Sequence, residues 1–186
     1  MGKREKGSAQ PAASLILPSI YIGPCSAASS KPFLTASSIT HVLSVGASPK
    51  ENIDGVIYHR ISITDSPSSS ISKVCEEAYT FIDIALRFQN ETGKILVHCS
   101  AGISRSPMIV AAYLIKRRGM SLREALGQIV VARPQVSPNA GFIAQLKELE
   151  LELLGTVSLD IDELPKREKD RLALFTDKTI GQVEAG

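Results

Sequence analysis

Short runs of aliphatic residues alternate with longer amphipathic segments over most of this chain. The runs rich in Val, Ile and Leu predict β-strands over 15–22, 41–45, 56–63 and 94–98. Apolar residues repeated at helical spacing predict one short helix within 26–39 and longer helices over 72–90, 107–116, 121–132 and 137–154. Because strands and helices alternate, the pattern predicts a single α/β domain.

Individual residues indicate where several of these helices begin and end. Ser72 is a candidate N-cap, and Ser121 with Glu124 three residues later forms a capping box. Pro138 is expected in the first turn of the last long helix, and Gly155 follows the final turn of the same helix.

The two ends of the chain lack the apolar periodicity of the middle. Residues 1–14 are mostly polar and are expected to form a flexible N-terminal tail. Residues 15–154 carry the predicted domain, and residues 155–186 form a C-terminal extension of unknown role. Within that extension, the acidic and apolar stretch 159–164 and the basic stretch 166–169 could dock a partner, although a solvated tail is the simpler interpretation.

Charge and composition argue against several function classes. The 186 residues carry a formal net charge of +2, without the basic stripe that binds nucleic acid. No apolar run approaches the roughly 18 residues needed to span a bilayer, so stable membrane insertion is not expected. Three cysteines, Cys25, Cys75 and Cys99, without a signal peptide argue for free thiols in a reducing compartment, hence a cytoplasmic or nuclear location. The pattern does not indicate an oligomeric state.

One segment combines four features that suit phosphate chemistry. The apolar strand that ends at His98 delivers Cys99, and Gly102 permits an unusual backbone turn soon afterwards. Arg105 follows in the same loop, and Pro107 suits the first turn of the helix that begins there. A loop that curls into a helix N-terminus turns several N–H groups inward, an arrangement that binds phosphate and favours a thiolate.

Each side chain of this segment has an expected use. A Cys99 thiolate attacks phosphorus, while the planar guanidinium of Arg105 holds two phosphate oxygens. The hydroxyl of Ser106 could donate to the sulfur and help it to leave, and the ring of His98 is expected to order the loop through hydrogen bonds. The residues expected to bind phosphate are Ser100, Ala101, Gly102, Ile103, Ser104 and Arg105.

The stretch from His98 to Arg105 resembles the signature of the protein tyrosine phosphatase superfamily, which is His-Cys, five residues, then Arg. The longer form His-Cys-x-Ala-Gly-x-Ser-Arg-Ser, the stretch 132–142 and the opening 20–23 are similar to its dual-specificity branch. The likeness covers about residues 15–154. It implies a central mixed, mostly parallel β-sheet flanked by α-helices, no metal or other cofactor, and a shallow site for phosphotyrosine and phosphoserine or phosphothreonine of a phosphorylated protein.

The resemblance also implies an aspartic acid on a separate loop that protonates the leaving oxygen. Asp65 is the best candidate, because it follows the strand ending at Ile63 and opens a Ser-rich loop that is expected to be mobile. Asp54 belongs to a turn signal and Asp83 to a predicted helix, so both are poorer candidates. A plain turn, in which the carboxylate of Asp65 bonds its own backbone, is the alternative.

Other residues and functions stay open at this point. Asn139 could hold the phosphate loop in place or simply stabilise the start of the last long helix, Cys75 is expected in the core, and Cys25 could be a redox partner of Cys99. The main prediction is a phosphoprotein phosphatase that works through a phosphocysteine. The alternatives are a phosphatase for a phosphoinositide or a phosphorylated glycan, and a catalytically weak phosphate-binding module. The interior of the loop carries no cation, which favours protein substrates over a multiply charged head group.

Overall fold

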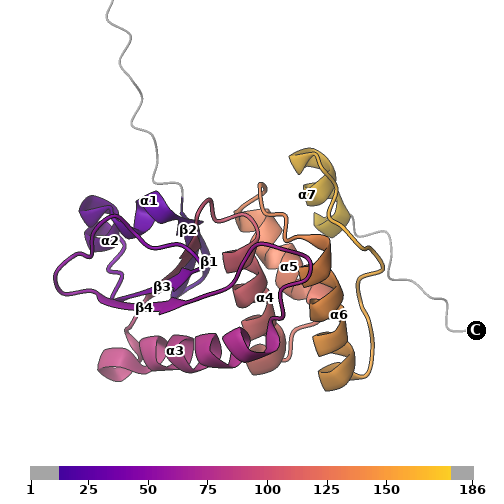
Figure 1. The fold of residues 1–186 in the computed structure, drawn as a ribbon, viewed down its shortest axis with the longest axis horizontal. Coiled ribbons are helices and arrows are strands. Elements are labelled where there is room, and N and C mark those ends of the chain that lie inside the picture. Colours follow the sequence, from indigo (N-terminus) through magenta and orange to yellow (C-terminus); the bar gives the residue numbers. More distant parts are fainter. Residues whose placement is uncertain (1–12, 177–186) are drawn as a thin grey trace, which may run out of the picture.

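The computed structural model describes residues 13–176 and is built around a five-stranded mixed β-sheet with helices on both faces (Figure 1). The strands are β1 Ser14–Leu17, β2 Ile20–Pro24, β3 His41–Val45, β4 Ile57–Ile61 and β5 Ile95–Cys99, in the spatial order β1-β2-β5-β3-β4. β1 pairs antiparallel with β2, whereas β2, β5, β3 and β4 run parallel. The predicted α/β class and the mixed, mostly parallel sheet are confirmed.

Within residues 13–176, seven helices connect and cover these strands. They are α1 Cys25–Ala28, α2 Lys31–Ala36, α3 Ser72–Glu91, α4 Arg105–Arg118, α5 Leu122–Ala132, α6 Ala140–Leu154 and α7 Glu168–Thr176. The short helices α1 and α2 cover one face of the sheet, and α3 and α4 cover the other (Figure 1). α5 and α6 pack against α4, and α7 lies against α5. Among the described residues, no helix is long and apolar enough to cross a membrane.

Alternating side chains on the central strands divide the core between the two faces of the sheet. Val42 of β3 and Leu96 of β5 are aligned and face α1 and α2. Their neighbours Leu43 and Val97 are aligned in the same way and face α3 and α4. Strands buried on both faces form continuous apolar runs, and this explains the strong strand signal in these two segments.

The parallel strands bring three distant loops to one edge of the sheet. In such sheets, ligand sites lie beyond the carboxyl ends of the strands. β3 ends at Val45 before Gly46, β5 ends at Cys99, and β4 leads into the loop that carries Asp65. These loops therefore meet at the same edge, although about 20 to 50 residues of chain separate them.

Several element boundaries differ from those predicted. The first strand, 15–22, is a hairpin, because residues 18–19 form a turn between β1 and β2. The segment 26–39 contains two short helices instead of one, and β4 is shorter than 56–63 at both ends. α4 begins at Arg105, two residues earlier than predicted, so the first residue of the helix carries the guanidinium.

Two predicted helix ends are confirmed. Ser121 and Glu124 form the capping box at the start of α5, in which each side chain bonds the backbone N–H of the other residue. Gly155 ends α6 with a left-handed backbone (φ 71°), a conformation that glycine adopts without strain.

Two predicted helix starts are wrong. Ser72 is the first residue of α3 and not its cap, since the N-cap is the apolar Ile71, whose side chain makes no capping bond. Pro138 lies before α6 and not in its first turn, because Asn139 is the N-cap and its side chain accepts a bond from the N–H of Phe142.

The described part of the C-terminal extension, up to Thr176, packs on the domain instead of forming a solvated tail. Leu159 and Leu164 are only 1% and 5% exposed and join the main core cluster. Phe175 of α7 lies against Gly127 of α5. The apolar residues of this segment are too irregularly spaced to show helical periodicity, so the sequence pattern does not reveal their burial. Residues 1–12 of the predicted N-terminal tail lie outside the described part of the chain, and Ser14 already belongs to β1.

Candidate active site

The loop that leads from β5 into α4, residues 99–105, curls around the side chain of Cys99. We call this loop, with its inward-facing amides, the cup. Cys99 is 2% exposed, and its Sγ accepts hydrogen bonds from Gly102 N at 3.3 Å and from Ser106 Oγ at 3.4 Å. The backbone amides of Ile103 and Ser106 also bond the sulfur. Three amides, those of Gly102, Ile103 and Ser106, therefore face the sulfur.

The hydrogen bonds around Cys99 favour a thiolate. Burial by itself would raise the pKa of this thiol, but bonds from the Ser106 hydroxyl and from the Ser106, Gly102 and Ile103 amides outweigh burial and lower the pKa below its ordinary value of 9.0. Cys75 provides the contrast, because in the apolar core burial raises the pKa of its thiol to about 12. The difference between the two cysteines comes from the hydrogen-bond donors of the loop.

The carbonyl groups on the outside of the loop explain why its amides face the sulfur. Arg133 Nε donates to Gly102 O at 2.8 Å, and Arg133 Nη2 donates to Ala101 O at 3.0 Å. Ser137 N donates to Ile103 O at 2.8 Å. In a planar trans peptide the C=O and the following N–H point in opposite directions. Holding the carbonyls of Ala101 and Gly102 outward therefore turns the N–H groups of the next residues inward.

Arg133 is a site residue to which the sequence analysis assigned no role. It is 3% exposed, and burial lowers the pKa of its guanidinium while the nearby Cys99 thiolate raises it. Arg133 belongs to the stretch 132–142 that resembles the phosphatase family, and this was the only signal that could have pointed to it.

A backbone carbonyl and a serine hydroxyl fix the guanidinium of Arg105 beside the loop. Nη1 donates to Gly46 O at 3.0 Å, and Nη2 donates to Ser100 Oγ at 2.9 Å. Nε is buried and has no hydrogen-bond partner among the described residues. It lies 3.8 Å from Asp65 Oδ2. Arg105 is thus held in place and keeps a buried donor for an oxyanion.

Two glycines permit this close packing. Gly102 has a positive φ of 69°, as predicted for the turn, and a Cβ there would come within 2.6 Å of the Gly23 carbonyl. Gly46, which the sequence analysis treated only as a strand end, also has a positive φ (68°). A Cβ at Gly46 would overlap Arg105 Nη1 and Ile63 O.

Asp65 reaches the same edge of the sheet and is bonded to the phosphate loop. Its Oδ1 accepts hydrogen bonds from Ser104 Oγ at 2.7 Å and from Asn139 Nδ2 at 2.9 Å. Asn139 N also donates to Ser104 Oγ at 3.2 Å. The side chain of Asn139 therefore caps α6 and bonds Asp65, while its contact with the phosphate loop comes from its backbone N–H.

The loop that carries Asp65 is packed on the start of α6. The side chain of Gln145 accepts from Ile71 N at 3.0 Å and donates to Ser69 O at 2.9 Å. Pro67 lies so close to Gly141 that a Cβ at Gly141 would overlap the Pro67 carbonyl. The Ser-rich loop is therefore bonded to α6 through Ser69 and Ile71.

His98 supports the loop from inside the core. Its Nε2 lies 2.7 Å from Ser44 Oγ, and its Nδ1 lies 3.2 Å from Cys99 O. Burial lowers the pKa of His98, so the ring is neutral near pH 7. These partners assign the proton to Nδ1, which donates to the Cys99 carbonyl, while Nε2 accepts from the Ser44 hydroxyl.

Cys25 lies beside the phosphate loop at the start of α1. Its backbone N donates to Ser100 O at 3.1 Å, and its thiol donates to Ser48 O at 2.8 Å. Burial, followed by the negative charge of Cys99, raises the pKa of Cys25, so its thiol stays protonated near the nucleophile. Both cysteines are free.

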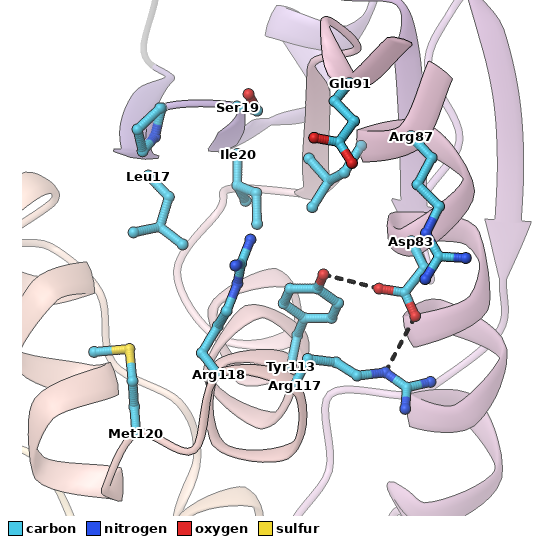
Figure 2. Close-up of a pocket in the computed structure, with 12 residues that line it drawn as sticks. Leu17, Ser19, Ile20, Asp83, Arg87, Glu91, Tyr113, Arg117, Arg118 and Met120 are labelled. Carbon is cyan, nitrogen blue, oxygen red and sulfur yellow. Dashed lines mark hydrogen bonds and ion pairs between the residues drawn. The ribbon is translucent and has the colours of Figure 1, made fainter. Parts of the chain in front are cut away.

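A separate pocket of about 890 Å³ lies at the opposite end of the strands, between the β1–β2 turn and the last turns of α3 and α4 (Figure 2). In it, Tyr113 donates to Asp83 Oδ1 at 2.9 Å and Arg117 Nε lies 3.1 Å from Asp83 Oδ2. None of the predicted site residues lines this pocket. Among the described residues, no cluster of three or more His, Cys, Asp or Glu side chains could hold a metal ion.

Comparisons with known proteins match the domain just described. A family model described as dual specificity phosphatase, catalytic domain, matches residues 20–152. Dual specificity protein phosphatase 1 of Arabidopsis thaliana is 41% identical over 138 residues, which is 74% of this chain and 68% of the relative. The crystal structure of human DUSP28 superimposes with a TM-score of 0.71 at 30% identity, covering 80% of this chain and 98% of the other. A human tyrosine phosphatase-like serine/threonine/tyrosine-interacting protein gives a TM-score of 0.70 at 34% identity, with coverage of 78% and 99%.

Proposed function

Because the chain belongs to the family of dual specificity phosphatase catalytic domains, we propose that Cys99, Arg105 and Asp65 carry out its reaction. The protein is a phosphatase for phosphotyrosine and phosphoserine or phosphothreonine in proteins, and it works through a phosphocysteine intermediate. One observation carries the assignment of residues: a buried sulfur bonded by several amides belongs to the same loop as a fixed guanidinium, and a carboxylate lies close to that guanidinium.

In the first step, Cys99 takes the phosphoryl group from the substrate. The phosphate dianion binds to the amides of residues 100–105 and to the guanidinium of Arg105, whose buried Nε is supplied with a partner by a phosphate oxygen. The thiolate attacks phosphorus, a P–S bond forms, and the P–O bond to the substrate breaks. Asp65 gives its proton to the leaving oxygen. The amides and Arg105 stabilise charge on the equatorial oxygens in the transition state.

In the second step, water releases the phosphate. Asp65 accepts a proton from the water as its oxygen attacks phosphorus, and the P–S bond breaks. The hydroxyl of Ser106, 3.4 Å from the sulfur, donates to the departing thiolate and stabilises its charge. Inorganic phosphate then leaves, and Cys99 is again a thiolate.

The side chains of Ser104, Asn139 and His98 position these groups and do not themselves bind the phosphoryl group that is transferred. Ser104 and Asn139 hold the carboxylate of Asp65 next to the phosphate loop. His98 bonds the carbonyl of Cys99 from below and fixes the peptide from which the nucleophile projects.

The lip of the cup supports a protein substrate. Ile103 is 36% exposed at this lip, where its apolar side chain can pack on an aryl ring or on a peptide. The interior of the loop has no Lys or Arg that would bind a second phosphate of a phosphoinositide.

We further propose that the protein works in the cytoplasm or the nucleus. A thiolate nucleophile must stay reduced, and all three cysteines are free. A fluorescent fusion of the full chain should be diffuse in these compartments. Accumulation in the secretory pathway would contradict this location.

Turnover of an aryl phosphate by three variants tests the assignment. We expect Cys99→Ser to abolish turnover while a phosphotyrosyl peptide still binds, because the amides and Arg105 remain. Asp65→Asn should lower kcat by roughly 10²-fold, the usual size of a general-acid effect. Asp54→Asn is the matched control, since Asp54 is an exposed turn residue, and it should keep full activity.

Three outcomes would contradict the proposal. Full activity of Asp65→Asn near pH 6 would remove Asp65 from the mechanism. Faster turnover of a phosphoinositide than of phosphopeptides would favour a lipid substrate. Binding of phosphopeptide by the wild type without any turnover would make the protein a phosphate-binding module.

A further inference from the structure

Arg171 ties the C-terminal extension to the loop that follows α5. This residue of α7 lies beyond the matched phosphatase domain, yet it is only 5% exposed. Its Nε donates to Pro134 O at 2.8 Å, and its Nη1 donates to Pro165 O at 2.6 Å and to Lys166 O at 2.9 Å. One guanidinium thus joins the segment before α7 to the segment after α5.

This arrangement is unusual for a buried charge. The ion pairs found among residues 13–176 do not include Arg171, and its partners are neutral carbonyls. Burying a charge is costly unless hydrogen bonds compensate, and a leucine or methionine would fill the same space at no such cost. The guanidinium is therefore explained by the backbone segments that it holds together, not by packing.

Arg133, the residue before Pro134, is hydrogen-bonded to the phosphate loop. Arg133 holds the carbonyls of Ala101 and Gly102, and Ser137 N holds that of Ile103. The segment 133–137 therefore has the phosphate loop on one side and Arg171 on the other.

α7 is itself fixed to the rigid part of the domain. Arg123 of α5 donates through Nη2 to Leu174 O at 2.7 Å, and Phe175 packs beside Gly127. Ser158 accepts a bond from Arg123 N at 3.0 Å. The extension is thus anchored on α5 at points other than Arg171, so it can act as a fixed support for the segment 133–137.

We propose that the C-terminal segment 155–176 keeps the phosphate loop in its anion-binding shape, with Arg171 as the positioning residue. This inference rests on the proposed function of the loop. When the bond to Pro134 is lost, Arg133 keeps its backbone bonds to Ile129 and Val136, but its guanidinium is less firmly placed against the carbonyls of Ala101 and Gly102. The amides of Gly102 and Ile103 then turn away from the sulfur, and both the thiolate and the bound phosphate lose stabilisation.

Arg171→Gln, studied in the full chain, tests this role. Arg167→Gln is the matched control, because it removes the same charge at the start of the same helix from an exposed side chain. Two quantities are measured against pH: kcat/KM for an aryl phosphate, and the rate at which iodoacetate alkylates Cys99, followed by mass spectrometry of the Cys99 peptide. The second quantity reports the thiolate without any turnover.

For Arg171→Gln we expect kcat/KM at about pH 6 to fall about tenfold, which corresponds to the loss of about one charge-assisted hydrogen bond. The alkylation profile should move to higher pH, because the pKa of Cys99 rises. Arg171→Lys, which can keep one of the three bonds, should lie between this variant and the wild type. Arg167→Gln should match the wild type in both quantities.

The outcomes separate this inference from the proposed function. If the wild type is active and Arg171→Gln has the same pH profiles of kcat/KM and of Cys99 alkylation, the inference about Arg171 is overturned. The proposed function then still stands. A wild type without turnover would overturn the proposed function, while a shifted Cys99 alkylation profile would still support the role of Arg171. If Arg171→Gln does not fold by circular dichroism, Phe175→Ala loosens α7 in a milder way. Unchanged profiles in a folded Phe175→Ala would then refute the inference.

Discussion

Gly46→Ala tests whether the fixed position of Arg105 matters for catalysis. The new methyl group would occupy space that Arg105 Nη1 and Ile63 O already fill, so the guanidinium must move away from the loop after β3. It would lose its 3.0 Å bond to the Gly46 carbonyl and its fixed direction toward the cup. The substitution leaves Cys99 and Asp65 chemically intact, so the variant isolates the guanidinium's placement.

The expected loss follows from the bond that is broken. A hydrogen bond to a charged group contributes about 1.5–3 kcal/mol. If about 2 kcal/mol of this is lost from the transition state, kcat/KM falls about 30-fold. The substitution also lowers the stability of the folded protein, because an L-residue at positive φ costs roughly 1–2 kcal/mol.

Gly55→Ala separates these two effects. Gly55 also has a positive φ (82°), but nothing lies within 4 Å of the position that its Cβ would take. Both variants should lower the midpoint of urea unfolding, and Gly46→Ala should lower it further, because its methyl group also overlaps Ile63 O. In an aryl phosphate assay, only Gly46→Ala should lose activity, and it should also bind inorganic phosphate more weakly as a competitive inhibitor. Equal kcat/KM values for the two variants would refute the argument that the carbonyl of Gly46 positions the guanidinium of Arg105.

Two further predictions concern pH. Ser106→Ala removes a donor that lowers the pKa of Cys99, so the acid limb of the kcat/KM profile should move to higher pH, and an unmoved limb would show that the hydroxyl does not stabilise the thiolate. Burial lowers the pKa of both His41 and His98 below the ordinary 6.5, so below that pH the unfolded chain binds protons that the folded protein does not. Urea unfolding midpoints should therefore be steady above about pH 7 and fall toward about pH 5, and equal midpoints at both pH values would count against neutral buried histidines.

The sequence revealed the nucleophilic loop because all its parts are neighbours in the chain. A buried strand, the thiol of Cys99, the positive φ of Gly102 and the guanidinium of Arg105 occur within eleven residues at the start of a helix. Each is a local property with its own sequence signal. The capping box of Ser121 was recognisable for the same reason.

The supports of this loop could not be read in the same way. Arg133 and Arg171 bond backbone carbonyls, and a carbonyl acceptor leaves no trace in the identity of the residue that provides it. Gly46 resembled an ordinary strand end until the packing of Arg105 against it was known. The burial of Leu159 and Leu164 was hidden because the extension packs through irregularly spaced contacts.

The loop of residues 65–71 carries Asp65 and is bonded to α6, and this affects how the enzyme binds its substrate. Through Ser104, the carboxylate of Asp65, the proton donor that we propose, is bonded to the loop that carries Cys99 before any phosphate arrives. The entropy of ordering residues 65–71 is lost once, during folding, and is not lost again at each encounter. We therefore expect a substrate bound at Cys99 to react without waiting for this loop to close.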